Sequence, residues 1–460
     1  MEIPDKQVTA PRDWLRRLQV GVCPSLMLAV LLLLNALFNF WQYATRSPGI
    51  DFFVLWSVPH VWKTKAVANI YAPDSQREMA SVLIAESSSP QVSQAQRDAT
   101  AIDMQLNDNR VDAIGSPLVY ALVGLTASGA YEKDLSRFRA ASWLCFLGAT
   151  IILCRLLQFP PVSMLLAAAL FTSSFQPLLA DMWVANLNQI QLLPLACFLL
   201  FVTRSWEVLA GLALGFGVML KPNVAIVAFL SVLVSLADRD YRRMTRLLLG
   251  MCLAALLSVA ISVSYFGRLA MWPDFIQSLP RTLASTSYPM ENGNIGLAVL
   301  LFRTMHREMS TYIFVILMAI VSIVIFKARW DRAGKVAAAP SRGAGESARS
   351  MRRMFVVVGL GCAVMLMSSR LVWPHYHVLL IPLELYLIRP VGWGDRPNRR
   401  LVVSMLAAIG FCLLSRAMWH EMADMLQGSI AVNAATALIF ILALCETWWQ
   451  AEDPVMVKSA

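Results

Sequence analysis

The chain is a succession of long apolar segments, and this pattern leaves few possible folds. About twelve segments are long enough to cross the ~30 Å hydrocarbon core of a bilayer, if some of them tilt or are short. Charged residues make up only 15% of the 460 residues, too few to cover a soluble protein of this size. The sequence therefore predicts an all-α polytopic membrane protein. The segments cover 22–43, 139–157, 161–178, 189–203, 206–220, 223–237, 246–266, 311–326, 354–370, 375–388, 401–415 and 429–448.

Lysine and arginine gather in alternate connections between these segments. They occur in 1–21, in 238–243, in 389–400 and in 327–353, where eight basic residues outnumber two acids. With twelve segments, all of these stretches fall on the side of the N-terminus, so the positive-inside rule places them and both termini in the cytoplasm. These loops also account for the net charge of +10 without a nucleic-acid partner. The pattern is typical of a bacterial inner (plasma) membrane protein.

The same reading divides the chain into parts. We expect a cytoplasmic tail at 1–21, a transmembrane domain over 22–448 and a second cytoplasmic tail at 449–460. Within the domain, 46–138 and 267–310 are long extracytoplasmic loops, and long loops are usually functional. Residues 327–353 form a cytoplasmic linker loop, and within it residues 328–350 are rich in Ala, Gly and Ser and are expected to be disordered.

An apolar stretch lies within the first of these loops. Residues 115–127 are too few for an ordinary span. We expect this stretch either to dip into the membrane or to lie along it.

Asp51 stands just beyond the first apolar segment, between a Pro-Gly turn and two phenylalanines. Partial removal from water would raise the pKa of its carboxyl toward that of a useful general base. The alternatives are a solvated loop acid and a helix N-cap.

His375 and His377 flank Tyr376 at the outer edge of an apolar segment, and the chain contains only five histidines. On a helix, residues two apart point to different faces, so one of the two would face a given site. Imidazole there could bind a phosphate or orient a hydroxyl. The alternative is a polar residue of the interfacial belt. The pair lacks a neighbouring carboxylate and is weak evidence for a metal site.

Asn186, Asn188 and Gln189 stand at the outer start of the fourth segment, where amides can hydrogen-bond sugar hydroxyls. Helix capping would explain one of them but not three. Lys221 occupies an outer turn between two short segments. A lysine near membrane depth implies an anionic partner such as a phosphate, unless it snorkels to the interface.

A third group of polar residues lies further along the chain. Asn292 and Asn294 form a polar turn, Arg303 follows them, and Arg370 precedes the histidines. By the topology above, every candidate falls on the extracytoplasmic side, whereas scattered polar residues would divide between the two faces. This convergence predicts a site at the outer surface of the membrane.

In their order along the chain, these residues resemble glycosyltransferase family 87, the polyprenyl-phosphate-mannose-dependent transferases with the multi-helix membrane fold called GT-C. Pro374 stands where that family often has an acid, and a Gly-Gln-x-Asn element appears here with its polar residues in another order. The resemblance covers about residues 45 to 390. It rests on Asp51-Phe52-Phe53 with Asn69–Ala72, Asn186–Gln189, Leu220-Lys221-Pro222, Asn292–Arg303 and Ser369–Tyr376.

The resemblance implies an inverting transfer of mannose or a similar sugar from a polyprenyl-phosphate donor to a lipid or glycan acceptor. Asp51 would be the general base, and Lys221, His375 and Arg303 or Arg370 would stabilise the charge of the leaving phosphate. Because the leaving group carries a single phosphate, no metal or other cofactor is expected.

Other functions fit parts of the pattern. A transporter or lipid flippase would suit twelve segments and polar groups at helix ends, but the sequence shows no six-segment repeat. Another GT-C branch would have an acidic pair early in the first loop, whereas the next acid after Asp51 is Asp74. A degenerate scaffold that keeps only the fold is the third alternative.

Overall fold

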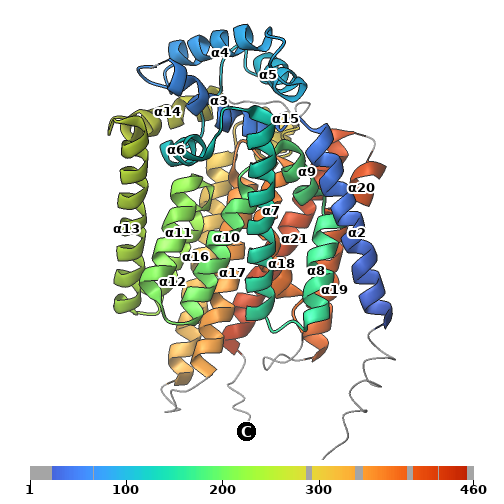
Figure 1. Ribbon diagram of the computed structural model, residues 1–460. Coiled ribbons are helices and arrows are strands. Elements are labelled where there is room, and N and C mark those ends of the chain that lie inside the picture. Colours follow the sequence, from blue (N-terminus) through green and yellow to red (C-terminus); the bar gives the residue numbers. More distant parts are fainter. Residues whose placement is uncertain are drawn as a thin grey trace, which may run out of the picture.

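The computed structural model describes residues 23–65, 67–285, 293–336, 345–390, 397–422 and 424–452. Within these ranges the regular elements are all helices, together with one isolated bridge between Phe175 and Ser415. Long, roughly parallel helices form a bundle, and shorter helices cover one of its ends (Figure 1). We call these shorter helices the cap.

The bundle is made of helices that run between its two ends. They are α2 (Cys23–Arg46), α7 (Tyr131–Leu156), α8 (Pro161–Ser174), α10 (Asn188–Thr203), α11 (Glu207–Leu220), α12 (Ala225–Ala237), α13 (Tyr241–Phe266), α16 (Ser310–Val336), α17 (Gly345–Ser368), η3 (Pro374–Leu380) with α18 (Ile381–Leu387), α19 (Pro397–Leu413) and α21 (Met425–Glu452). The start of α2 and the end of α21 both lie at the end opposite the cap (Figure 1).

The cap is formed by segments between α2 and α7 and between α13 and α16. Its helices are α3 (Ile50–Thr64), α4 (Pro73–Ser87), α5 (Gln94–Leu106), α6 (Pro117–Thr126), α14 (Met271–Ser285) and α15 (Leu297–Met305). Three short helices complete the described elements: α9 (Gln176–Val184), η1 (Pro222–Val224) and α20 (Arg416–Glu421).

Several bundle helices carry apolar side chains on their outer surface, as a bilayer requires. Six helices in the described part of the chain are long and apolar enough to cross a membrane: those of α2, α7, α13, α16, α17 and α21. Shorter apolar helices include α8, α10, α11 and η1 with α12. In the apolar stretches of α2 and α16, only 17% and 22% of the residues are buried, whereas 89% are buried in that of α17. α17 is therefore the central helix of a multi-pass membrane protein.

The apolar core has two parts. One fills the bundle and surrounds α17 with residues of α7, α8, α10, α12, α19 and α21. The other lies beneath the cap, where α3, α5 and α6 pack on the cap-side ends of α7, α10 and α13. Trp56 of α3 and Tyr120 of α6 are fully buried in this second part, so the cap is a packed unit and not a loose loop.

The structure differs from the sequence-based boundaries where helices continue beyond their apolar part. α7 begins at Tyr131 and not at 139, because its first turns carry polar residues. The expected disordered linker is wrong for most of its length, since α16 continues to Val336 and α17 begins at Gly345. Residues 337–344 lie outside the described part. The apolar stretch 115–127 forms α6, which packs between α3 and α13.

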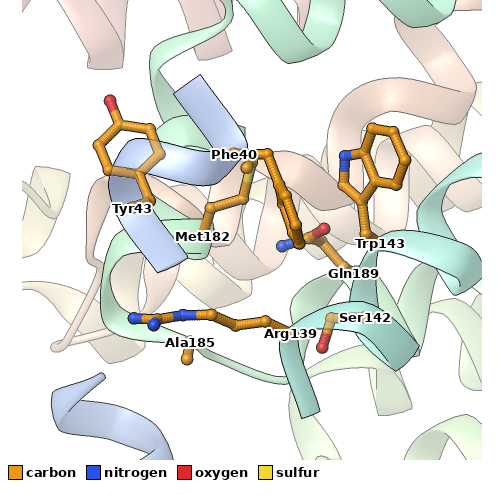
Figure 2. Close-up of a pocket in the computed structure, with 8 residues that line it drawn as sticks. All are labelled: Phe40, Tyr43, Arg139, Ser142, Trp143, Met182, Ala185 and Gln189. Carbon is orange, nitrogen blue, oxygen red and sulfur yellow. The ribbon is translucent and has the colours of Figure 1, made fainter. Parts of the chain in front are cut away.

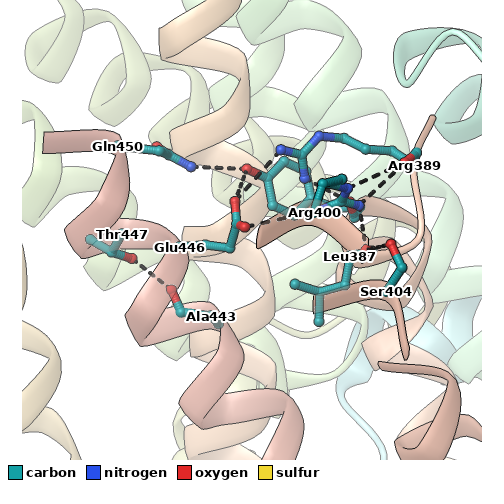
Figure 3. Close-up of polar contacts among 9 residues, drawn as sticks. Leu387, Arg389, Arg400, Ser404, Ala443, Glu446, Thr447 and Gln450 are labelled. Carbon is teal, nitrogen blue, oxygen red and sulfur yellow. Dashed lines mark hydrogen bonds and ion pairs between the residues drawn. The ribbon is translucent and has the colours of Figure 1, made fainter. Parts of the chain in front are cut away.

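Figure 3 shows a buried polar network around Glu446. Glu446 is close to the end of α21, and that end of the helix lies opposite the cap (Figure 1). Glu446 of α21 accepts a hydrogen bond from the Tyr386 hydroxyl at 2.9 Å and lies 3.6 Å from Arg389 and 3.9 Å from Arg400. Gln450 donates to the same hydroxyl at 2.9 Å. Two of the arginines used to orient the chain are therefore buried ion-pair partners of α21.

Candidate active site

Asp51 is placed at the bundle end of the cap by a tight turn before α3. Gly49 has a φ of 68°, and a Cβ at this position would lie 2.5 Å from Leu135 Cδ1, so glycine fits where other residues would not. The Tyr131 hydroxyl donates to the carbonyl oxygen of Gly49 at 3.0 Å, which ties the turn to α7. Asp51 thus falls in the first turn of α3, where the helix dipole favours a carboxylate.

Asn186 links Asp51 to Lys221. Its Nδ2 donates to Asp51 Oδ2 at 2.5 Å, and its Oδ1 accepts a hydrogen bond from Lys221 Nζ at 3.1 Å. One end of the amide therefore contacts the Asp51 carboxylate of α3, and the other end contacts the Lys221 ammonium of the turn after α11. Asn186 follows Ala185, whose φ of 56° ends α9 sharply and turns the amide toward Asp51.

A second amide and an aromatic ring hold Lys221 from other sides. Asn188 Oδ1 accepts from Lys221 Nζ at 3.1 Å, and the ammonium lies 3.9 Å from the centre of the Tyr376 ring. Gln191 Nε2 donates to the backbone carbonyl of Lys221 at 2.8 Å. The lysine side chain is thereby fixed at the start of η1, at the cap end of the bundle.

His375 completes the cluster from η3. Its Nε2 lies 3.5 Å from Asp51 Oδ2, and its side chain is only 5% exposed. His377 belongs to a different set of contacts: its ring nitrogens lie 3.2 Å from the Pro374 carbonyl and 3.1 Å from Thr436 Oγ1. As the spacing predicts, only one of the two histidines faces Asp51.

Asp181 of α9 is a member of the cluster that sequence reasoning missed. It is fully buried and accepts hydrogen bonds from Asn188 Nδ2 at 2.8 Å and Gln189 Nε2 at 2.9 Å. In the sequence it is a single acid among apolar residues, Leu179-Ala180-Asp181-Met182. That isolation was the available signal, because a buried acid requires partners.

Gln189 also lines a small cavity with residues of α2, α7 and α9 (Figure 2). Ser142 and Trp143 of α7 face it, together with Phe40 and Tyr43 of α2. Gln189 therefore contacts Asp181 through its amide nitrogen and also lines a cavity with residues of α7.

The electrostatics of the cluster follow from burial and from neighbouring charges. Burial raises the pKa of the Asp51 carboxyl, although the hydrogen bond from Asn186 and the charge of Lys221 act in the opposite sense. Burial lowers the pKa of the Lys221 ammonium to about 8, while Asp51 and Asp181 favour its charged form. The Asp51 side chain remains 33% exposed, which leaves it accessible to a substrate.

The other predicted site residues make their contacts elsewhere or are exposed. Asn294 accepts from Val372 N at 3.0 Å and donates to the Arg370 carbonyl at 2.8 Å, so it anchors the loop that leads to His375. The Arg370 side chain pairs with Glu308 at 2.7 Å. Arg303 is exposed in the last turn of α15, and Asn292 lies outside the described residues.

An apolar cavity of about 370 Å³ adjoins the polar cluster. Three of its wall residues are chain neighbours of the cluster: Phe52 follows Asp51, Leu187 follows Asn186 and Leu220 precedes Lys221. The opposite wall is formed by α6 and α7, and the lining residues Arg137 and Ala141 of α7 are exposed. The cavity therefore reaches the side of a helix long enough to span a membrane.

Comparison with known proteins gives one match. A family model described as glycosyltransferase family 87 matches residues 115–369, more than half of the chain. This range includes Asp181, Lys221 and the three amides, whereas Asp51 and His375 lie outside it. No curated protein and no solved structure matches the chain. Among the described residues, no group of three His, Cys, Asp or Glu side chains could hold a metal ion.

Proposed function

Because the chain belongs to glycosyltransferase family 87 and is a multi-pass membrane protein, we propose that it transfers a sugar from a polyprenyl-phosphate donor. The sugar is mannose or a similar hexose or pentose, and the acceptor is a lipid or glycan hydroxyl. The observation that carries the proposal is the pairing of Asp51 with Lys221 through the single amide of Asn186. This pairing supports the proposal, because an acid that can act as a general base and a cation that can bind phosphate are only one side chain apart.

Asp51 is the general base in this reaction. Its carboxylate takes the proton of the acceptor hydroxyl while the hydroxyl oxygen attacks the anomeric carbon of the donor. The bond from that carbon to the phosphate oxygen breaks on the opposite face, so configuration inverts. The lipid phosphate leaves as an anion. His375 of η3 lies beside the proposed base, with its Nε2 3.5 Å from Asp51 Oδ2.

Lys221 stabilises the charge that develops on the leaving phosphate. Its ammonium is already held by Asn186, Asn188 and the Tyr376 ring, so it needs little rearrangement during the reaction. The adjoining apolar cavity supports a lipid carrier, because an isoprenoid chain attached to a phosphate at Lys221 has apolar walls beside it.

The same proposal includes the topology. The cap, with loops 46–138 and 267–310, faces the extracytoplasmic side of a bacterial inner membrane, and residues 1–21, 327–353 and 449–460 face the cytoplasm. A GT-C arrangement of about twelve spans accommodates the helices whose length falls below that of an ordinary span.

Sugar transfer by the detergent-purified full chain tests this function. Radiolabelled polyprenyl-phosphate sugars would be supplied one at a time with total membrane lipid as acceptor. We expect transfer from one donor and a loss of at least about 100-fold in Asp51→Asn, the contribution typical of a general base. Asp74→Asn is the matched control, because Asp74 is also a first-turn acid of a cap helix but its side chain is 95% exposed.

Either of two results would count against the proposal. Transfer that survives in Asp51→Asn removes Asp51 from its role. Absence of transfer from every donor, together with movement of lipid across reconstituted vesicles, favours a flippase.

A further inference from the structure

Asp181 does not face the position of the reacting groups, yet it determines how two of the site amides are oriented. A carboxylate can only accept hydrogen bonds, so the amide nitrogens of Asn188 and Gln189 must point toward it, at 2.8 and 2.9 Å. The oxygen of Asn188 must then point away, and it accepts from Lys221 Nζ at 3.1 Å. The order of acid, amide and ammonium allows only one orientation of the Asn188 side chain.

The charges around Lys221 come from three elements. Asp51 approaches from α3 and Asp181 from α9, while His375 and Tyr376 of η3 bring no anion. During transfer, Asp51 accepts a proton and loses its charge. Burial raises the pKa of the Asp181 carboxyl, whereas the hydrogen bonds from Gln189 and Asn188 and the charge of Lys221 favour its ionised form. In that form, the fully buried Asp181 is the anion that remains near the ammonium when Asp51 is protonated.

We propose that Asp181 is a positioning residue: a buried counter-anion that, through Asn188, orients Lys221 and preserves its charge at the phosphate-binding end of the site. The inference rests on the proposed function, since it assigns the lipid phosphate to Lys221. Asp181 itself touches no substrate and acts through the amide relay.

Binding of a polyprenyl phosphate without a sugar tests the inference separately from catalysis. Affinity would be measured across pH 6 to 10 for the purified full chain. In the wild type, binding weakens as pH rises through about 8, because Lys221 then loses its proton. In Asp181→Asn, we expect about tenfold weaker binding near neutrality. The midpoint of the pH-dependent loss of binding should also fall by about one pH unit, because the Lys221 ammonium has lost a nearby anion.

Glu384→Gln is the matched control. Glu384 is another buried acid, 3% exposed, in α18, away from the amide relay. Its replacement removes a buried carboxyl and should leave the midpoint unchanged. If Asp181→Asn does not fold, Asn188→Leu decides the question, because it breaks the relay at similar volume and should also lower the midpoint.

The outcomes separate the two proposals. Weaker binding with an unchanged midpoint would mean that Asp181 only supports the fold, and would overturn the inference while leaving the transferase intact. Failure of the wild type to bind any polyprenyl phosphate would overturn both. A lowered midpoint in Asp181→Asn together with an unchanged one in Glu384→Gln establishes the positioning role.

Discussion

Asn186 makes the shortest side-chain contact to the candidate base, and this contact affects when the base can work. Its Nδ2 hydrogen bond favours the ionised form of Asp51 and so opposes the rise in pKa caused by burial. The charge state of the base at a given pH therefore depends on a neutral neighbour.

We expect Asn186→Ala to move the acidic limb of the kcat–pH profile to higher pH by about one unit. The sign follows from the base being active only when ionised: loss of the donor raises the pKa of Asp51, so activity falls earlier as pH decreases. Initial rates at saturating donor between pH 4 and 9 measure the shift. Asn107→Ala, which removes a comparable 2.8 Å contact to Asp103 in the cap, should leave the limb in place. An unmoved limb in Asn186→Ala would contradict the assignment of Asp51 as the base.

α11 and α13 approach each other closely, and glycine makes this approach possible. A Cβ at Gly250 would meet backbone atoms of Val208, Gly211 and Leu212, so the two backbones touch directly. Lys221 directly follows the last residue of α11, Leu220, so the position of this helix determines the position of Lys221.

We expect Gly250→Ala to push α11 away from α13 and displace Lys221. Overpacking of this kind costs about 1–3 kcal/mol of stability, and the KM for the donor should rise. Thermal unfolding in detergent and donor-dependent rates measure the two effects. Gly148→Ala is the control, because its nearest new neighbour would be Leu193 Cδ1 at an ordinary 3.6 Å. Equal behaviour of the two variants would show that the close approach has no role in positioning Lys221.

The Glu446 network offers a second test at the level of elements. We expect Glu446→Gln to lower stability by about 3–5 kcal/mol, because Arg389 and Arg400 stay buried without their carboxylate. Transfer at low temperature should stay close to the wild-type rate, since the network lies at the end of the bundle away from the cap (Figures 1 and 3). Glu421 is an exposed acid of α20, and Glu421→Gln should change neither the stability nor the rate of transfer. A selective loss of activity at unchanged stability would refute a structural role for this network.

For the molecule as a whole, the arrangement of cap and bundle predicts which loops face each side of the membrane. Ser88 lies in the cap, and Ser205 lies in the connection between α10 and α11; both are exposed. In intact cells, a membrane-impermeant maleimide should label Ser88→Cys and should not label Ser205→Cys until the cells are opened. The unmodified chain supplies the background from its own cysteines. The reverse labelling pattern would invert the proposed orientation.

Much of the architecture could be predicted because membrane-spanning helices consist of long runs of apolar residues. The predicted segments coincide with helices, but the true ends lie in polar turns that hydropathy does not report, as at Tyr131 of α7. Asp51, the three amides, Lys221 and His375 lie in one cluster in the structure, and their roles in catalysis stay a prediction. Asp181 was missed because its partners are residues 188 and 189, and only the sharp turn at Ala185 brings them to it.

The apolar cavity beside the cluster has a kinetic consequence. Its lining reaches the flank of α7, so a lipid that uses it is drawn from the surrounding bilayer or micelle and not from water. For the polyprenyl-phosphate donor proposed above, the relevant substrate concentration is then its mole fraction among the lipid and detergent molecules. Diluting a fixed amount of donor with more detergent should slow transfer even though its bulk concentration is unchanged, and the apparent KM is a property of the mixture as much as of the protein.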